Sequence, residues 1–299
     1  TGSSDRTVEI ARAFGARIEY RQWRDDFAWA RNESLAMATK RWVLQLDADE
    51  ELLPESLEAL QQLKKTPAHL VGVYVRCINK SDRYGGGEMS HATSRVFPNH
   101  ERIRYTGLIH EFACLDGNAK GIAAVLSPVK ILHHGYTSEM VESRGKNARN
   151  LRILEESIRR EPGEAFHWYN YGLTTFLMGE TEKAVDAMER MYELTRDDAR
   201  AFVPNGLQIL ADAYTERLGQ PKKGLEYAQL ALKLSPNYAN AHFSAGKAYM
   251  HMQHWERSRE MYKAAIDDAR QTVQQFIVDD EISRWKAHSE IGATYALEG

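Results

Sequence analysis

The stretch Trp42-Val43-Leu44-Gln45-Leu46-Asp47-Ala48-Asp49-Glu50 organises the first half of this 299-residue chain. Its first five residues are mostly apolar and predict a buried β-strand. Two aspartates spaced i, i+2 follow the strand at once, and two glutamates follow the second of them. In open α/β sheets, ligands bind beyond the carboxyl ends of the strands. The acidic pair is therefore predicted to lie where the chain leaves a sheet, in a position suited to binding.

Asp47 and Asp49 are the residue type that a hard divalent cation requires. Mg²⁺ and Mn²⁺ take one or two carboxylates and leave other positions to substrate phosphates. This interpretation predicts a site for a metal ion and a nucleoside diphosphate. The alternative is that the carboxylates favour the first turn of a helix, since residues 52–57 resemble a helix start. A D-x-D pattern is short and common, so the rest of the chain has to decide.

Composition indicates an ordinary globular chain long enough for two domains, 43% hydrophobic and 27% charged. The net charge of -3 gives no electrostatic reason to expect a nucleic-acid or membrane-surface partner. Cys77 and Cys114 are too few for a disulfide framework and lack metal-ligand spacing, so a reducing, cytoplasmic setting is predicted. No apolar run reaches the ~20 residues of a membrane span, and no signal-peptide pattern is seen.

The first seven residues, Thr1-Gly2-Ser3-Ser4-Asp5-Arg6-Thr7, predict a turn that runs directly into a helix. Turns of this kind normally follow a strand, and here neither a strand nor an initiator methionine precedes the turn. We therefore expect that the whole protein has a preceding strand–helix–strand of a parallel sheet.

Residues 1–137 predict a mixed α/β domain. Helical patterns cover residues 7–15, 27–39 and 54–64. Apolar or alternating runs predict strands over residues 17–20, 42–46, 70–79, 93–98, 102–105 and 125–133. A glycine-rich segment, residues 84–87, is interpreted as a loop.

From residue 138 onward only helical periodicity remains, first as a basic connecting helix (138–164) and then as a repeat (165–299). The repeat positions are Trp168, Tyr171, Gly172, Ala184 and Met188; then, with one inserted residue, Leu210, Ala211, Tyr214, Gly224, Ala228, Ala231 and Pro236; then Ala245, Gly246, Tyr249, Ser258, Tyr262 and Ala265; and a partial copy at 291–295. A period of ~34 residues with small residues at helix crossings is the tetratricopeptide signature. Such helix pairs bury their apolar faces by stacking on one another.

With these pieces in order, the chain resembles a bacterial family-2 glycosyltransferase of the GT-A fold that carries C-terminal tetratricopeptide repeats. The segments that carry the resemblance are residues 1–7, Ala30-Arg31-Asn32, Leu46-Asp47-Ala48-Asp49-Glu50, Arg95-Val96-Phe97, Ile109-His110-Glu111, His133-His134-Gly135-Tyr136 and the basic run 144–150. The family's first strand, and the aspartate that it has before Thr1, are not in this sequence.

The resemblance implies an N-terminally truncated, Rossmann-like mixed sheet over residues 1–137 and an all-α solenoid over residues 165–299. It also implies a metal-dependent, inverting enzyme that moves a sugar from a nucleotide-diphosphate donor to a peptide, lipid or saccharide acceptor. The expected cofactor is Mn²⁺ or Mg²⁺. The repeats are expected to recruit a protein or peptide partner.

The resemblance assigns roles to individual residues. Asp47 would hold the ribose or a metal-bound water, Asp49 would bind the metal, and Arg31 would reach the nucleotide; the alternative for Arg31 is a solvated surface arginine. Inverting transfer needs a base that deprotonates the acceptor, and a positioned carboxylate suits that step. Glu111 is the predicted base, with a surface glutamate beside a core His110 as the alternative.

The remaining candidates rest on less specific signals. A neutral imidazole is a fair ligand for Mn²⁺, so His133 is predicted to complete the metal site, although His134 is adjacent and a strand histidine is often structural. Three basic residues are candidates for clamping the diphosphate, with a solvated helix face as the alternative: Arg144, Lys146 and Arg149.

Two other functions fit parts of the sequence. One is a non-catalytic scaffold in which the repeats do the binding and the first domain is degenerate; the acidic pair, Glu111 and His133 argue against it. The other is a nucleotidyltransferase on a similar sheet, for which a glycine-rich, basic phosphate loop is expected and none is seen.

Overall fold

The computed structural model describes residues 2–3, 5–65, 72–81, 87–117, 122, 124–136, 144–196, 200–270 and 278–299. The chain divides into two compact units that alternate along the sequence. The first consists of Thr1–Ala48, Leu52–Val75 and Thr93–Lys130, and the second of Asp49–Glu51, Arg76–Ala92 and Ile131–Gly299.

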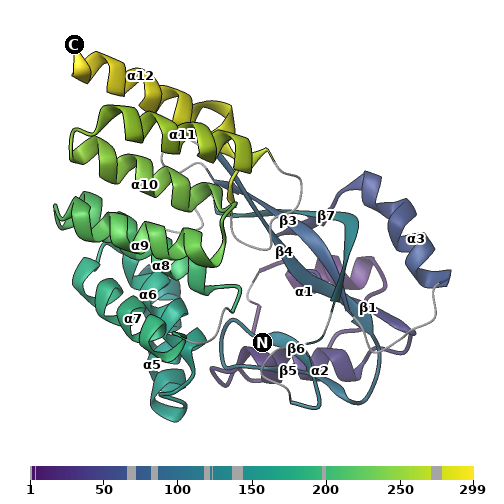
Figure 1. Cartoon of the computed structure of the whole chain (residues 1–299). Helices are drawn as coiled ribbons and strands as arrows, with labels where there is room; N and C mark the ends of the chain where they lie inside the picture. Colours follow the sequence, from purple (N-terminus) through teal and green to yellow (C-terminus); the bar gives the residue numbers. More distant parts are fainter. Residues whose placement is uncertain are drawn as a thin grey trace. The chain divides into compact units, whose positions relative to one another are not determined.

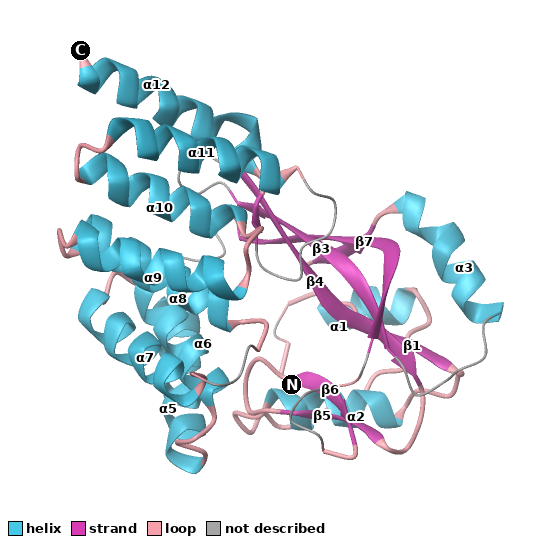
Figure 2. Cartoon of the chain, in the orientation of Figure 1, coloured by secondary structure: helices cyan, strands magenta, loops and turns pink. Residues whose placement is uncertain are grey.

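The first half of the chain is mixed α/β, as the sequence predicts (Figures 1 and 2). Its helices are α1 (Thr7–Ala13), α2 (Phe27–Ala36) and α3 (Leu57–Lys65), the last preceded by a 3₁₀ turn, Pro54–Ser56. Its strands are β1 (Trp42–Leu44), β2 (Glu50–Leu52), β3 (Gly72–Ser81), β4 (Gly87–Pro98), β5 (Ile103–Thr106), β6 (Phe112–Leu115) and β7 (Ala124–Tyr136).

The main sheet has the order β1-β4-β3-β7-β2, and β5 and β6 form a separate two-stranded sheet. β1 and β4 pair antiparallel, with Val43 opposite Phe97. β5 and β6 are also antiparallel, with Ile103 opposite Leu115. The core of the first unit is formed by residues of α2, β4, β5 and β6 together with Ile122. Its buried residues are Ala28, Leu35, Phe97, Ile103, Tyr105, Ala113 and Ile122.

The strand that leads to the acidic pair is less buried than predicted. β1 ends at Leu44, which is 36% exposed, and Leu46 is 40% exposed. β1 stands at the end of the sheet order and pairs with β4, so only one of its edges is covered by the described strands. An apolar run does not by itself distinguish an edge strand from a central one.

One predicted strand is absent: residues 17–20 form no strand, and their side chains are largely exposed and offer no face to bury. Two strands were not predicted, β2 (Glu50–Leu52), where a helix start was the alternative for the acidic run, and β6 (Phe112–Leu115). Both form by pairing with strands elsewhere in the chain, which local pattern does not report.

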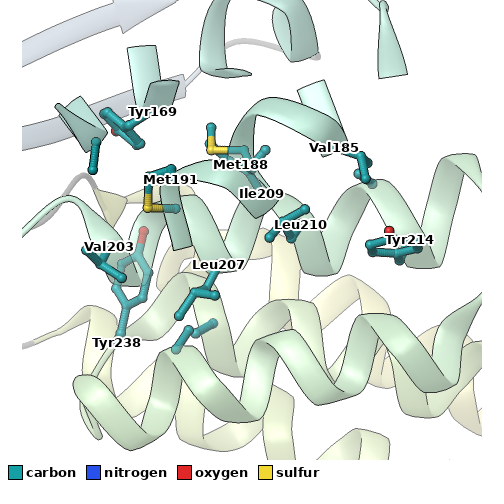
Figure 3. Close-up of a cluster of buried hydrophobic side chains, with 14 residues drawn as sticks. Tyr169, Val185, Met188, Met191, Val203, Leu207, Ile209, Leu210, Tyr214 and Tyr238 are labelled. Carbon is teal, nitrogen blue, oxygen red and sulfur yellow. The ribbon is translucent and has the colours of Figure 1, made fainter. Parts of the chain in front are cut away.

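The second half of the chain is a stack of helix pairs (Figure 1). Its helices are α5 (Arg144–Arg160), α6 (Ala165–Leu177), α7 (Thr181–Leu194), α8 (Val203–Asp212), α9 (Pro221–Leu234), α10 (Ala239–His251), α11 (Trp255–Ala269) and α12 (Ala287–Glu298). Buried residues from α6 to α9 share one core with Tyr238, which precedes α10 (Figure 3). The pairs follow the predicted tetratricopeptide pattern.

The residue inserted in the second repeat is absorbed by a π-helical turn. Residues Ala213–Arg217 continue α8 as a π-helix, and Leu218 N–H donates to Ala213 C=O at 3.0 Å. A π-turn contains one more residue than an α-turn. The extra residue is therefore accommodated before α9 begins, and Ala228 and Ala231 still reach the core.

A short strand in the second unit, β8 (Val278–Asp279), pairs antiparallel with β4, with Ser90 opposite Val278. The next residue, Asp280, contacts Ser90 Oγ and the Arg76 guanidinium, each at 3.4 Å. Among the described residues, no helix combines the length and apolar character needed to cross a membrane.

Glycines at the helix crossings allow the paired helices to touch. A Cβ atom on Gly246 would lie 2.6 Å from Cε1 of the fully buried Tyr262, and a Cβ on Gly172 would lie 2.9 Å from Cγ of Met188. The equivalent glycine of α12, Gly292, has no atom within 4 Å of its Cβ position. The same residue type is thus demanded by packing in one helix and not in the other.

We predict that Gly246→Ala lowers the free energy of unfolding by about 1–3 kcal/mol, because the added methyl group overpacks against the Tyr262 ring. Gly292→Ala is the matched control, and its effect is expected to be neutral or stabilising by up to ~1 kcal/mol from helix propensity. Chemical denaturation measures both. Equal changes in the free energy of unfolding for the two variants would mean that the close contact between Gly246 and Tyr262 does not limit stability.

Candidate active site

The side chain of Asn32 fixes α2 to β5 in the first unit. Its Oδ1 accepts from Tyr105 N–H at 2.9 Å, and its Nδ2 donates to Tyr105 C=O at 3.0 Å. Phe27 N–H, at the start of α2, donates to Leu108 C=O at 2.8 Å. α2 is thereby attached to both β5 and the loop that follows it. Arg31 on α2 and Glu111 beyond the loop are positioned by the same contacts.

The loop that presents Glu111 has an unusual backbone. Gly107 has a φ of 98°, and His110 has a φ of 54°. Positive φ is uncommon for residues other than glycine, and such strain concentrates at functional sites. The turn leaves the Glu111 side chain only 10% exposed. His110 is therefore an exposed turn residue beside the candidate base, and the alternative of a core His110 beside a surface glutamate is wrong.

Arg31 lies between two carboxylates. Its Nη2 is 2.7 Å from Asp47 Oδ1, and its Nε donates to Glu111 Oε1. Burial by itself would lower the pKa of the Arg31 guanidinium, but the charges of Glu111 and Asp47 outweigh it and the pKa is raised. A second guanidinium, that of Arg95, approaches Asp47 Oδ2 at 3.5 Å. Arg31 is thus a paired residue of the site and not a solvated surface arginine.

Gln45 and Tyr105 complete this cluster, and neither of them was predicted as a site residue. The Gln45 amide lies 2.8 Å from the Tyr105 hydroxyl. With the amide oxygen turned to Arg31, it accepts from Nη1 and Nη2 at 3.0 Å each and also from Arg95; the reverse orientation would place N–H groups against both cations. The one sequence feature that could have identified Gln45 is its position as a polar residue within the apolar run 42–46.

Asp49 belongs to a different cluster, in the second unit. His133 Nε2 lies 3.3 Å from Asp49 Oδ2, and His133 Nδ1 lies 2.8 Å from Asn79 Oδ1. Asn79 is in turn 3.3 Å from the ring of His91. His134 makes a separate contact, at 3.3 Å, with the exposed Glu51.

The Asp49–His133 pair is chemically suited to a divalent cation. Because Asn79 Oδ1 only accepts, His133 Nδ1 carries the proton in the neutral ring, and Nε2 then faces the Asp49 carboxylate as a second acceptor. A metal-bound histidine characteristically donates its other N–H to an oxygen acceptor in this way. No group of three or more His, Cys, Asp or Glu side chains arranged to hold a metal is found in the described part of the chain.

The remaining sequence candidates are three basic residues of α5 and the glycine-rich loop. The Arg149 guanidinium contacts its neighbour Asn150 at 3.0 Å, and the side chains of Arg144 and Lys146 lie outside the described residues. So does the predicted loop at residues 84–86, and Gly87 begins β4.

Comparison with known proteins separates the two halves of the chain. Residues 1–121 match the family described as glycosyl transferase family 2. A TPR repeat-containing protein of Synechococcus elongatus is 29% identical over 300 residues, which cover 91% of this chain and 67% of that protein. The SPbeta prophage-derived glycosyltransferase SunS of Bacillus subtilis is 26% identical over 72% of this chain. The chain spans about half, 51%, of the length of SunS.

Among solved structures, a fragment of MamA from Desulfovibrio magneticus RS-1 is 18% identical, with a TM-score of 0.42 over 54% of this chain and 81% of that one.

We predict that Asn32→Ala destabilises the first unit by about 1–3 kcal/mol, since it leaves the N–H and C=O of the buried Tyr105 without their partner. Asn32→Asp retains the acceptor and loses the donor, so an intermediate loss is expected. Thermal unfolding of both variants shows which of them loses more stability. Equal stability of Asn32→Ala and the unmodified chain would show that α2 is held by apolar packing alone.

Proposed function

Because residues 1–121 match the glycosyl transferase family 2 domain, we propose that this chain transfers a sugar from a nucleotide-diphosphate donor to an acceptor hydroxyl or thiol. The observation that carries the proposal is the convergence of Arg31, Asp47 and Glu111 from three separate segments of the sequence. A packed core does not require two carboxylates around one guanidinium, whereas clusters of interacting charges are concentrated at functional sites.

Donor binding is assigned to the two arginines and the two aspartates. Guanidinium groups bind phosphates through paired hydrogen bonds, so Arg31 and Arg95 suit the diphosphate, and Asp47 suits the ribose. Asp49 and His133 would hold Mn²⁺ or Mg²⁺, which accepts one or two protein ligands together with phosphate oxygens. When bound, the metal neutralises charge on the departing nucleoside diphosphate.

Glu111 is proposed as the base. It would accept the acceptor's proton as the acceptor atom bonds to the anomeric carbon and the bond to the diphosphate breaks, with inversion at that carbon. The helix pairs would recruit a protein or peptide, since stacked repeats present an extended binding surface. The alternative, a scaffold without catalytic activity, predicts no metal-dependent nucleotide binding at all.

The first test is calorimetric titration of the full chain with uridine and guanosine diphosphates, with and without Mn²⁺. Asp49→Ala is expected to remove the manganese-dependent part of the affinity, because the metal loses its carboxylate ligand. Glu51→Ala is the matched control, since Glu51 contacts the exposed His134 instead. Retained manganese dependence in Asp49→Ala would place the metal elsewhere.

Glu111→Gln is expected to lower the rate of transfer by about 10²–10⁴-fold, the usual contribution of a general base. Nucleotide affinity is expected to be at least as high as in the unmodified chain, because glutamine has the same shape and no charge. Single-turnover transfer and titration with the nucleoside diphosphate measure the two effects. Transfer at a near-normal rate would exclude Glu111 as the base.

A further inference from the structure

Four of the five N–H donors of the Arg31 guanidinium face protein groups. Its Nε donates to Glu111, its Nη2 contacts Asp47 at 2.7 Å, and both of its Nη atoms lie 3.0 Å from the Gln45 amide oxygen. Arginine has five N–H donors in a rigid fork. A phosphate therefore cannot take a paired contact with this guanidinium unless a present partner releases it.

Asp47 and Glu111 differ in whether an ion-pair partner remains when Arg31 moves away. Asp47 retains Arg95, whose Nη2 lies 3.5 Å from Oδ2. Within the described part of the chain, the ion pair formed by Glu111 is with Arg31. Exposure differs in the same sense: the side chains of Asp47 and Arg31 are 34% and 25% exposed, and that of Glu111 is 10% exposed. A ligand thus reaches Arg31 and Asp47 more readily than Glu111.

We propose that Arg31 is a positioning residue that couples donor binding to release of Glu111. The inference rests on the proposed function and adds its regulation. In the free chain Arg31 holds Glu111 in an ion pair. A nucleoside diphosphate draws the guanidinium away, and Glu111 becomes free to accept a proton.

The charge balance supports this exchange. Arg31 and Arg95 face Asp47 and Glu111, so the free cluster has two cations and two anions. A diphosphate adds negative charge that competes directly with Glu111 for the same guanidinium, and bidentate phosphate–arginine contacts are among the stronger charge-assisted hydrogen bonds. Glu111 and the diphosphate are then coupled negatively through Arg31, and linkage requires that removing one strengthens binding of the other.

The consequence for the reaction is an order of events. Before the donor binds, Oε1 of Glu111 accepts from Arg31 and the carboxylate is held in that ion pair, so an acceptor hydroxyl or thiol is not activated. After the donor binds, Glu111 takes the acceptor's proton while the new glycosidic bond forms and the diphosphate leaves. The base is thus available only when a nucleoside diphosphate group, such as that of the sugar donor, is bound.

The test is a double-mutant cycle on nucleotide binding. Uridine diphosphate and guanosine diphosphate are titrated with Mn²⁺ into the full chain, Glu111→Gln, Arg31→Gln and the double variant. Glu111→Gln is expected to tighten binding by about 5-fold or more, because typical couplings between two ligands are about 5–150-fold. Arg31→Gln is expected to weaken binding, and adding Glu111→Gln to it is expected to change nothing further.

Glu33→Gln is the matched control. It removes a carboxylate from the same helix, but Glu33 pairs with Arg21, at 2.6 Å, and not with Arg31; unchanged nucleotide affinity is expected. Should Glu111→Gln fold poorly, Glu111→Asp withdraws the carboxylate by one methylene and is expected to tighten binding less strongly.

Unchanged or weakened binding in a folded Glu111 variant would overturn the inference, as would equal tightening in the Arg31→Gln background. Those outcomes leave the proposed function intact, because the unmodified chain still binds the nucleotide. Absence of any manganese-dependent nucleotide binding by the unmodified chain would instead overturn the proposed function, and the coupling with it.

Discussion

The paired hydrogen bonds between the Asn32 side chain and the backbone of Tyr105 are the constraint on which the candidate site depends. They hold α2 to β5 by a donor and an acceptor at once, so the helix can neither slide nor rotate without breaking both. Arg31 precedes Asn32 on this helix, and Glu111 follows the turn after β5. The distance between the guanidinium and the carboxylate is therefore set by backbone contacts and not by the ion pair alone.

The helix pairs obey a different constraint, which is close approach. Gly172 and Gly246 remove the side chain where Met188 and Tyr262 cross them, and the π-turn after α8 absorbs an extra residue. These features preserve the register of buried residues through a sequence that departs from a strict period. The repeat half thus depends on small residues that let helices pack closely. The first half depends on side-chain hydrogen bonds such as those of Asn32 with Tyr105.

The candidate site separates two aspartates that the sequence presents as one motif. Asp47 contacts Arg31 and Arg95, and Asp49 contacts His133, whose other nitrogen faces Asn79. In a regular strand, residues i and i+2 point to the same face, but the chain turns at residues 48–49, and the two carboxylates meet different partners. This division agrees with separate proposed roles, one toward the nucleotide and one toward a metal.

The sequence by itself determined the class of each half, the repeat positions and most candidate residues, because these depend on local periodicity and on motifs of fixed spacing. Only the tertiary structure decided that β1 stands at the end of the sheet order formed by the described strands, that Glu50–Leu52 form a strand, and that Gln45, Arg95 and Tyr105 join the cluster of Arg31 and Asp47. The physical reason is that strand pairing and charge partners join residues far apart along the chain. Arg31 and Glu111 illustrate this: no spacing rule connects them, and α2 and the turn after β5 bring them into contact.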